Sequence, residues 1–209
     1  MKVIFFDTET NGLPHSRKAP ETLVENWPFI VSLAWRVYDV GNESMTMLSE
    51  QYSIVSPREG MTWSQDSQNI HGISLAKATV EGKPIREVLA MFKAEAEACV
   101  AIVAHNLAFD RPVLLSELRR CGFSVSCWPS KQYCTMDNTK GLCKLPSKFS
   151  KPADPYKFPK LSELHSYLFG NAGEFAFHSA LDDVRCLVKC FEELHFRRLV
   201  PLDDWALSA

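Results

Sequence analysis

Two acidic residues, Asp7 and Glu9, follow a short apolar run at the start of the sequence. Residues two apart on a β-strand point to the same face of its sheet, so the two carboxylates are expected side by side where the strand ends. Carboxylates that close repel each other, and a cation that prefers oxygen ligands, Mg²⁺ or Mn²⁺, relieves the repulsion. The pair therefore indicates a metal site, with a solvated strand end as the alternative.

A second polar group follows another apolar run, residues 100–104. It contains Asn106, Phe109 and Asp110, and Asp110 stands where a helix is expected to begin. The first interpretation is that the Asp110 carboxylate simply caps the helix. That role does not account for Asn106 or Phe109, so the second interpretation is that this segment contributes to the same site.

The third group, His178 and Asp183, lies at the start of an expected C-terminal helix. At about 100° per residue, Asp183 falls on the flank of the apolar face of this helix, whereas Asp182 falls nearly opposite that face. The side chain of Asp183 can therefore point toward a site beside the core. His178 precedes the helix and can reach the same site. The apolar face consists of Ala180, Val184, Leu187, Val188, Phe191 and His195.

The elements that position these groups follow from hydrophobic periodicity and turn residues. Residues 2–6, 29–40 and 47–55 read as strands. The connection at 41–46 is too short for a crossover helix, so these strands are expected to form an antiparallel meander. Further strands are expected at 100–104 and 132–136, helices at 64–70, 84–99, 110–121, 161–169 and 179–196, and irregular structure at 137–160. Together they describe a mixed α/β sheet.

Taken together, the three polar groups resemble the three motifs of the DEDDh 3′–5′ exonucleases, the DnaQ-like family of the ribonuclease H-like superfamily. Residues 6–13 are similar to the first motif, and residues 106–110 match the second, NxxFD. His178 followed by Asp183 matches the third motif, HxxxxD. The tyrosine branch of the family has Tyr where this chain has Ser179, so the histidine branch is favoured. The motifs occur in the family's order and span nearly the whole chain.

The resemblance implies a role for each residue of these motifs. Asp7 would bridge two divalent metal ions, Mg²⁺ or Mn²⁺, about 4 Å apart. Glu9 and Asp183 would complete the shell of the first ion, and Asp110 would serve the second. His178 would be the general base, since an unperturbed histidine pKa of about 6.5 suits that task near neutral pH. The product would be a nucleoside 5′-monophosphate, released one at a time.

The same resemblance implies contacts that hold the terminal nucleotide. The backbone after the first motif would grip the 3′ end, and Leu13 is positioned like an apolar wedge beside the last base. His71 lies in a segment similar to one that contacts substrate in relatives, with a helix-terminal histidine as the alternative. Asn106 and Phe109 are expected to shape the site rather than touch the metals. The expected substrate-binding residues are Thr8, Thr10, Asn11, Leu13, His71, Asn106 and Phe109.

A lysine-rich stretch between positions 140 and 160 holds a single acid, Asp154. Basic charge interleaved with aromatic residues suits a single nucleic-acid strand, whose bases stack while its phosphates pair with lysine. The alternative is a solvated loop. Its lysines are Lys140, Lys144, Lys148, Lys151, Lys157 and Lys160, and its aromatic residues are Phe149, Tyr156 and Phe158.

Composition limits the remaining possibilities. The chain has 209 residues, 46% of them hydrophobic, and 23 basic against 25 acidic residues give a formal net charge of −2. A protein that binds the double helix by charge alone would be strongly basic, so any nucleic-acid function must rest on a local site. Seven cysteines without a CxxC pair are typical of a reducing compartment and argue against a zinc ribbon. No stretch approaches a membrane span or a signal peptide, so we expect a cytoplasmic protein without a membrane partner.

These observations predict a single DEDDh exonuclease domain, residues 1–209, of the α/β class. Its ribonuclease H-like mixed sheet would have five strands, an antiparallel meander of three plus parallel strands, flanked by helices. The expected function is metal-dependent 3′–5′ exonuclease activity on single-stranded or frayed DNA ends. The alternatives are an exoribonuclease similar to RNase T or oligoribonuclease, and a proofreading subunit that works with a DNA polymerase or a second subunit. A catalytically silent nucleic-acid-binding module is disfavoured, because all four carboxylates and the histidine are present.

Overall fold

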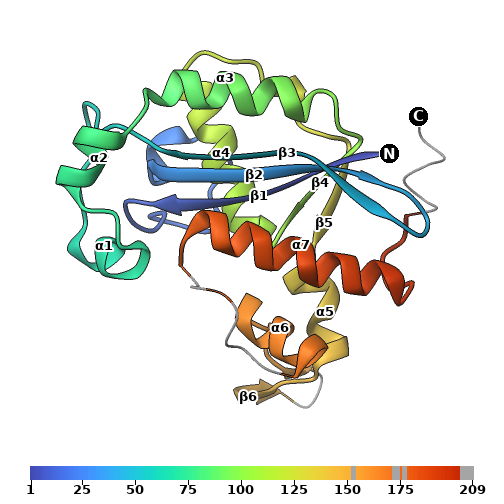
Figure 1. Ribbon diagram of the computed structural model, residues 1–209. Helices are drawn as coiled ribbons and strands as arrows, with labels where there is room; N and C mark the ends of the chain where they lie inside the picture. Colours follow the sequence, from blue (N-terminus) through green and yellow to red (C-terminus); the bar gives the residue numbers. More distant parts are fainter. Residues whose placement is uncertain (152–153, 171–174, 176–177, 203–209) are drawn as a thin grey trace.

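The computed structural model describes residues 1–151, 154–170, 175 and 178–202. Seven strands lie in these ranges: β1 (Lys2–Thr10), β2 (Ile30–Val40), β3 (Met45–Ile54), β4 (Ala101–Ala104), β5 (Lys131–Cys134), β6 (Pro146–Lys151) and β7 (Asp154–Tyr156). The first five form one sheet in the order β3-β2-β1-β4-β5. Strands β3, β2 and β1 pair antiparallel, whereas β1, β4 and β5 pair parallel (Figure 1). The predicted mixed five-stranded α/β sheet is therefore confirmed.

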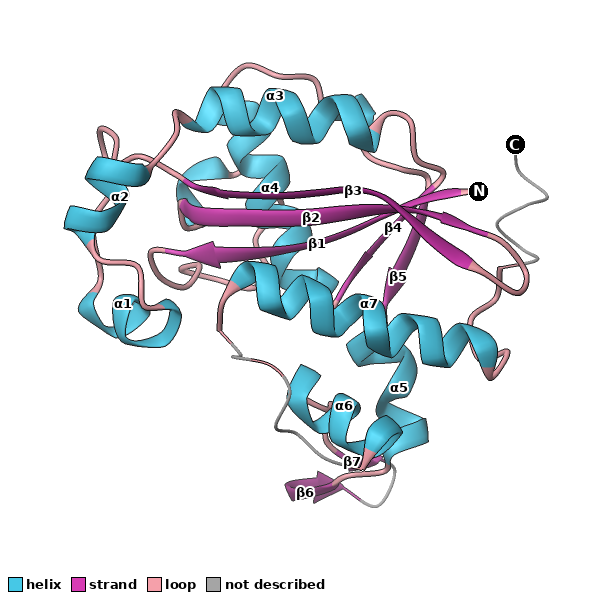
Figure 2. Ribbon diagram, in the orientation of Figure 1, coloured by secondary structure: helices cyan, strands magenta, loops and turns pink. Residues whose placement is uncertain are grey.

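Helices cover both faces of this sheet (Figure 2). On β1, Phe6 packs against Phe92 on one face, and Phe5 packs against Phe191 on the other. A strand covered on both faces needs a continuous apolar run rather than alternation, which explains residues 3–6. The helices are α1 (Gln65–His71), α2 (Leu75–Glu81), α3 (Ile85–Ala96), α4 (Leu107–Arg120), α5 (Thr135–Cys143), α6 (Leu161–Phe169) and α7 (Ala180–Phe196), with short 3-10 turns η1 (Val24–Asn26) and η2 (Val125–Cys127).

The segment 137–160 is where the sequence-based prediction of irregular structure is wrong. Helix α5 occupies its start, and β6 pairs with β7 in a separate two-stranded sheet. Asp, Asn, Thr and Gly give α5 a weak intrinsic helix propensity. The helix is held instead by its buried face, where Thr135, Thr139 and Cys143 recur at a spacing of four residues. Because α5 begins at Thr135, the strand predicted at 132–136 ends at Cys134.

Helices α4 and α2 also differ from the prediction. Helix α4 begins at Leu107 rather than at Asp110, so the carboxylate of Asp110 lies in the first turn and Asn106 is the N-cap. Helix α2 has no counterpart in the prediction, although Ser74 caps it by accepting a hydrogen bond from the backbone of Lys77. Among the described residues, no helix has the length and apolarity needed to cross a membrane.

The fold brings the three polar groups to one edge of the sheet. Parallel strands β1 and β4 end at the same edge, and α4 follows β4 there. Helix α7 packs against β1 and β2 and begins near this edge (Figure 1). Segments separated by more than 100 positions are thereby joined, as in the hydrogen bonds between Thr8 and Asp110, 102 positions apart.

Candidate active site

A trio of carboxylates gathers at the end of β1. Asp7 and Glu9 alternate along the strand with buried Thr8 and Thr10, so both acids lie on the face that opens to the site. Asp183, in the first turn of α7, joins them, and the three residues offer oxygen atoms that all lie within 4.8 Å of one another. A donor set made only of carboxylate oxygens fits Mg²⁺ or Mn²⁺, which prefer hard oxygen ligands.

Asp110 lies beside this trio and is held in place by Thr8. Its side chain is buried, and its Oδ1 accepts hydrogen bonds from the Thr8 hydroxyl at 2.7 Å and the Thr8 backbone N–H at 3.2 Å. Helix α4 is started by Asn106, which adopts a left-handed conformation with φ 74° and accepts a hydrogen bond from the backbone N–H of Phe109. Asp110 is therefore fixed beside the carboxylate trio and is not the helix cap.

The four carboxylates are electrostatically frustrated when no cation is bound. Burial raises the pKa of Glu9 to about 8, that of Asp110 to about 7 and that of Asp183 to about 6. Burial also raises the pKa of Asp7 well above its usual range, and the three neighbouring carboxylates raise it further. The hydrogen bonds from Thr8 lower the pKa of Asp110 and offset part of the burial effect. A divalent cation would favour the charged forms and reverse these shifts.

His178 is tied to the trio through its backbone. Its N–H donates a hydrogen bond to Oδ2 of Asp183 at 3.0 Å, and its φ of 73° lies in the left-handed region. A left-handed conformation at a residue other than glycine is uncommon and marks a position fixed by its surroundings. The side chain is exposed, so the imidazole is open to a solvent molecule or a substrate beside Asp183.

A cleft of about 440 Å³ opens beside Glu9. It contains five of the seven residues expected to bind substrate: Thr8, Thr10, Leu13, His71 and Phe109. Leu13 is 73% exposed and Ile70 is 58% exposed, so two large aliphatic side chains stand free in the cleft. Such a lining suits the flat faces of a nucleobase rather than water. Sequence reasoning missed the other polar lining residues, Ser64, Asp66 and Ser67, although Ser64 carries the signal of a helix N-cap.

The other two expected substrate contacts, Asn11 and Asn106, do not line the cleft. The side chain of Asn11 is used within the protein: its Nδ2 donates to the carbonyl of Thr62 at 2.7 Å, and its Oδ1 accepts from the N–H of Phe29 at 2.8 Å. These bonds fix the turn that presents Leu13. Asn106 acts through the start of helix α4, where it orients the first turn that carries Asp110.

His71 is a wall of the cleft and also a structural residue. Its ring is largely buried, and Nδ1 accepts a hydrogen bond from the backbone N–H of Ile73 at 3.0 Å. Burial lowers the pKa of His71, so the ring is neutral near pH 7. With Nδ1 an acceptor, the neutral ring carries its proton on Nε2, which leaves one donor for a group in the cleft.

The lysine-rich stretch is partly neutralised by one acid of its own and one on α6. Lys140 pairs with Asp154 at 2.6 Å and lies over the ring of Phe158, and Lys157 pairs with Glu163. The exposed lysines among the described side chains are Lys144, Lys148 and Lys160, whereas the side chains of Phe149 and Lys151 lie outside the described part.

The stretch is joined to the sheet by His105, which follows β4. One ring nitrogen of His105 lies 2.9 Å from the Thr135 hydroxyl, and the other lies 3.0 Å from the carbonyl of Pro159. Burial lowers the pKa of His105 to about 4, so the ring is neutral, donates from Nε2 to Pro159 and accepts from Thr135. This contact places the end of the stretch beside the residue that precedes Asn106.

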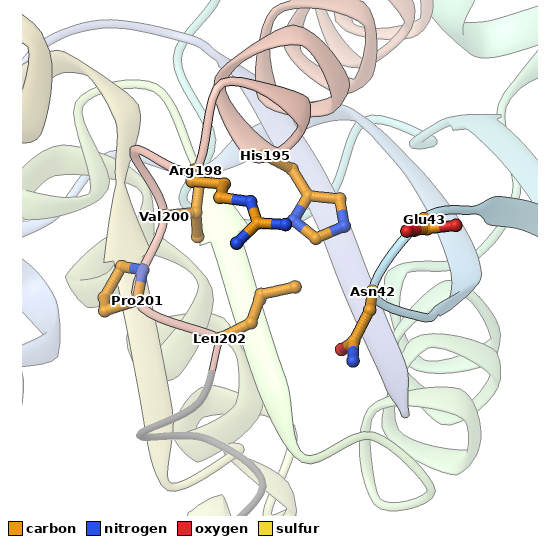
Figure 3. Close-up of a pocket in the computed structure, with 7 residues that line it drawn as sticks. All are labelled: Asn42, Glu43, His195, Arg198, Val200, Pro201 and Leu202. Carbon is orange, nitrogen blue, oxygen red and sulfur yellow. The ribbon is translucent and has the colours of Figure 1, made fainter.

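A second hollow, of about 370 Å³, lies at the far end of α7 (Figure 3). Glu43 and Asn42 from the β2–β3 turn line one side, and His195 and Arg198 line the other. The ring of His195 is buried, and its Nε2 donates a hydrogen bond to the carbonyl of Gly41 at 2.8 Å. This hollow contains none of the predicted site residues.

Comparison with known proteins is consistent with the geometry. A protein-family model described as "Exonuclease" matches residues 4–191 of the chain. Comparison with the curated proteins gives no match.

Solved structures of exonuclease I share the fold. The chain superposes on Escherichia coli exonuclease I in complex with a dT13 oligonucleotide with a TM-score of 0.74 and 16% identity, covering 99% of this chain and 43% of that one. The zinc-bound form of the same enzyme with single-stranded DNA gives 0.72 and 17%, with coverage of 99% and 43%. Exonuclease I from Methylocaldum szegediense gives 0.71 and 15%, with coverage of 94% and 41%. The chain thus spans less than half of the length of these structures.

Proposed function

The chain belongs to the exonuclease family, the DnaQ-like 3′–5′ exonucleases of the ribonuclease H-like superfamily, and we propose that it is a metal-dependent nuclease for DNA. In this proposal it removes nucleoside 5′-monophosphates one at a time from single-stranded or frayed 3′ ends. The observation that carries the proposal is the trio of Asp7, Glu9 and Asp183, whose oxygens lie within 4.8 Å of one another and whose Glu9 lines the cleft.

The acids of the site would hold two divalent ions, Mg²⁺ or Mn²⁺. Asp7 is central, because its pKa responds to all three other carboxylates, and it is the residue we assign to both ions. Glu9 and Asp183 are assigned to one ion and Asp110 to the other. Two ions in such a site activate the attacking water and stabilise the leaving oxygen of a phosphodiester. Thr8 contributes by holding one oxygen of Asp110.

His178 is the residue we assign as general base. Its exposed ring can accept a proton from the attacking water at a ring nitrogen, and its backbone is anchored to Asp183. The left-handed backbone keeps this residue outside the first turn of α7, with its N–H bonded to Asp183. A positioned base of this kind contributes about 100-fold to 10,000-fold to the rate.

The cleft beside Glu9 would hold the terminal nucleotide. Leu13 and Ile70 offer the exposed apolar surface on which a base can lie, and Phe109 closes the cleft from α4. His71 Nε2 and the hydroxyl of Thr10 supply hydrogen-bonding groups. Exonuclease rather than endonuclease action is supported by the family model that matches residues 4–191.

Single-stranded DNA is the substrate we favour over RNA, because solved exonuclease I structures with the same fold are described with DNA oligonucleotides. Three further predictions belong to this proposal. The chain acts as one domain spanning residues 1–209, it is located in the cytoplasm, and it works with a polymerase or a second subunit in proofreading or repair. No described contact bears on a partner chain.

The test is digestion of matched 5′-labelled DNA and RNA oligonucleotides, single- and double-stranded, with Mg²⁺, with Mn²⁺ and with a chelator. We expect a ladder shortened from the 3′ end, fastest for single-stranded DNA and absent with chelator. Asp183→Asn should abolish it. Asp182→Asn is the matched control, because the Asp182 carboxylate binds Arg185 at 3.4 Å instead of joining the trio. Digestion from the 5′ end, or an active Asp183→Asn variant, would contradict the proposal.

A further inference from the structure

A third hollow, of about 560 Å³, lies on the other side of the first turn of α4 from the cleft. Phe109 faces the cleft, and the preceding residue, Ala108, lines this hollow. None of the four carboxylates of the site lines it. Its lining residues are Arg17, Ala19, Pro20, Glu21, Thr22, Trp27, Leu107, Ala108, Arg111 and Pro112.

The hollow carries unused guanidinium donors. Arg17 is exposed and makes no hydrogen bond or ion pair with any residue that the structure describes. Arg111 pairs with Glu21 through Nη1 at 3.3 Å, but its buried Nε has no partner within the described ranges. Glu21 is shared with Arg119, also at 3.3 Å, so it does not neutralise Arg111 alone. The exposed guanidinium of Arg17 and the 40% exposed side chain of Arg111 both line the hollow, and such a pair matches an anion with several oxygens, such as phosphate.

The wall that carries Arg17 is fixed in advance. Arg120 of α4 donates to the backbone carbonyls of Val24, Trp27 and Pro28, and the Ser116 hydroxyl donates to the carbonyl of Glu21 at 3.1 Å. These bonds hold the loop between β1 and β2 against α4. A preformed anion site loses less conformational entropy on binding than a free loop would.

The hollow is connected to the cleft along the protein surface. Trp27 also lines a smaller hollow of about 360 Å³, which shares Gly12 and Leu13 with the cleft. We propose that Arg17 and Arg111 bind a phosphodiester group of the hydrolysed strand, upstream of the bond that is cut. This inference rests on the proposed function and makes affinity depend on strand length.

The first experiment measures single-turnover release of the terminal nucleotide from DNA of two to about ten nucleotides. Arg17→Gln is the key variant, because it removes no described contact and therefore does not threaten folding. We expect about tenfold lower kcat/KM on the longest strand, a smaller loss on the dinucleotide, and a salt slope shallower by about 0.7. Lys18→Gln is the matched control, because it makes the same charge change at the next exposed position of the loop, outside the hollow.

The second experiment places one neutral methylphosphonate linkage at each position of the strand in turn. One position should weaken the wild type and have no further effect in Arg17→Gln, because the same contact is then already lost. Arg111→Gln should show the same non-additivity at the same position. Additive losses at every position, or an Arg17→Gln variant that behaves like Lys18→Gln, would overturn the inference.

Two further measurements distinguish a strand-binding site from a site for free phosphate, and the inference from the proposed function. If inorganic phosphate alone fills the Arg17 site and strand length does not change the affinity for DNA, the hollow is a site for free phosphate and the inference is wrong. Fluorescence anisotropy of a labelled DNA strand in chelator measures binding without cleavage. A chain that binds DNA with Arg17-dependent affinity but never cuts it would refute the nuclease and keep the phosphate site. A chain that cuts DNA with no Arg17 dependence would do the reverse.

Discussion

Helix α7 has a histidine at each end, and the two ends differ in how their charges are satisfied. At its start, His178 is exposed and Asp183 faces Asp7 and Glu9. At its end, His195 is buried and its Nε2 is bonded to the carbonyl of Gly41 (Figure 3). The cleft beside Glu9 and the hollow at the end of α7 have similar volumes, about 440 Å³ and 370 Å³. Size therefore does not distinguish the candidate site from the other hollow.

Unbalanced charge does distinguish them. At the start of α7, four carboxylates share one edge, and burial with mutual repulsion raises the pKa of Asp7. Such an arrangement is costly for folding and persists where a bound cation relieves it. At the end of α7, the His195 ring donates within the protein and leaves no comparable imbalance. The comparison predicts that changes at the start alter activity, whereas changes at the end alter stability.

The largest effect is expected from Asp7→Asn. Removing the carboxylate assigned to both ions should lower kcat by more than about 100-fold, since groups that merely orient metal ligands already contribute about 10-fold to 100-fold. The same variant should raise the thermal stability of the metal-free protein, because it removes a buried charge that three carboxylates repel. Asp39→Asn, an exposed acid on β2, is the control. Activity within about tenfold of wild type would remove Asp7 from the site.

His178→Gln is expected to come next. Loss of a general base lowers kcat by about 100-fold to 10,000-fold. It should leave metal affinity nearly unchanged, because His178 is not part of the carboxylate trio. Titrating Mg²⁺ against activity checks both points. A variant with normal kcat but weaker metal binding would identify His178 as a ligand instead.

The carboxylates of the site should contribute less to the stability of the metal-free protein as pH rises from about 4 to about 8. The folded pKa values of Glu9, Asp110 and Asp183, about 8, 7 and 6, lie above the usual carboxyl range near 4. In this window these three groups bind more protons in the folded state than in the unfolded state, so each rise in pH makes their contribution to stability less favourable. Mg²⁺ should therefore raise Tm more at pH 8 than at pH 5, as calorimetry would show. An equal shift at both values would contradict the raised pKa values.

At the other end of α7, His195→Phe should leave kcat unchanged and lower stability. The carbonyl of Gly41 would lose its donor, at a cost of about 1–3 kcal/mol. In a chain of this size that corresponds to a Tm lower by roughly 2–4 °C per kcal/mol. Thermal unfolding with parallel nuclease assays measures both quantities. A loss of activity without a loss of stability would show that the two ends of α7 are not functionally distinct.

The smallest effect is expected from Leu13→Ala. This side chain is 73% exposed, so its removal should not alter stability, but loss of contact with the terminal base should raise KM by about five- to tenfold. Leu48→Ala, at a 49% exposed leucine on β3, is the matched control. Equal KM values for the two variants would show that Leu13 is an ordinary surface residue.

The sequence predicted the parts of the site that depend on local geometry. Strand alternation placed Asp7 and Glu9 on one face, and helix periodicity separated Asp182 from Asp183. The structure agrees: Asp183 joins the trio, whereas Asp182 binds Arg185. The sheet could also be predicted from the sequence, because its apolar runs and short connections are local signals.

Features that depend on contacts between distant residues could not be predicted from the sequence. Asn11 bonds to Thr62, 51 positions away, and no local pattern reveals that its amide would be occupied. Helix α5 is stabilised by its packing rather than by its residues' propensities, so the sequence read as irregular. Arg17 had no motif at all; its role in the hollow depends on the fold of the loop against α4.

The placement of Asp183 on the last helix has a consequence for the order in which the protein is made. Chains emerge and fold from the N-terminus, and domains fold as units during synthesis. A growing chain that ends before position 178 contains Asp7, Glu9 and Asp110 but lacks both His178 and Asp183. The site is therefore incomplete until the start of α7 has been synthesised. A nascent nuclease of this design would be inert beside the messenger RNA that encodes it.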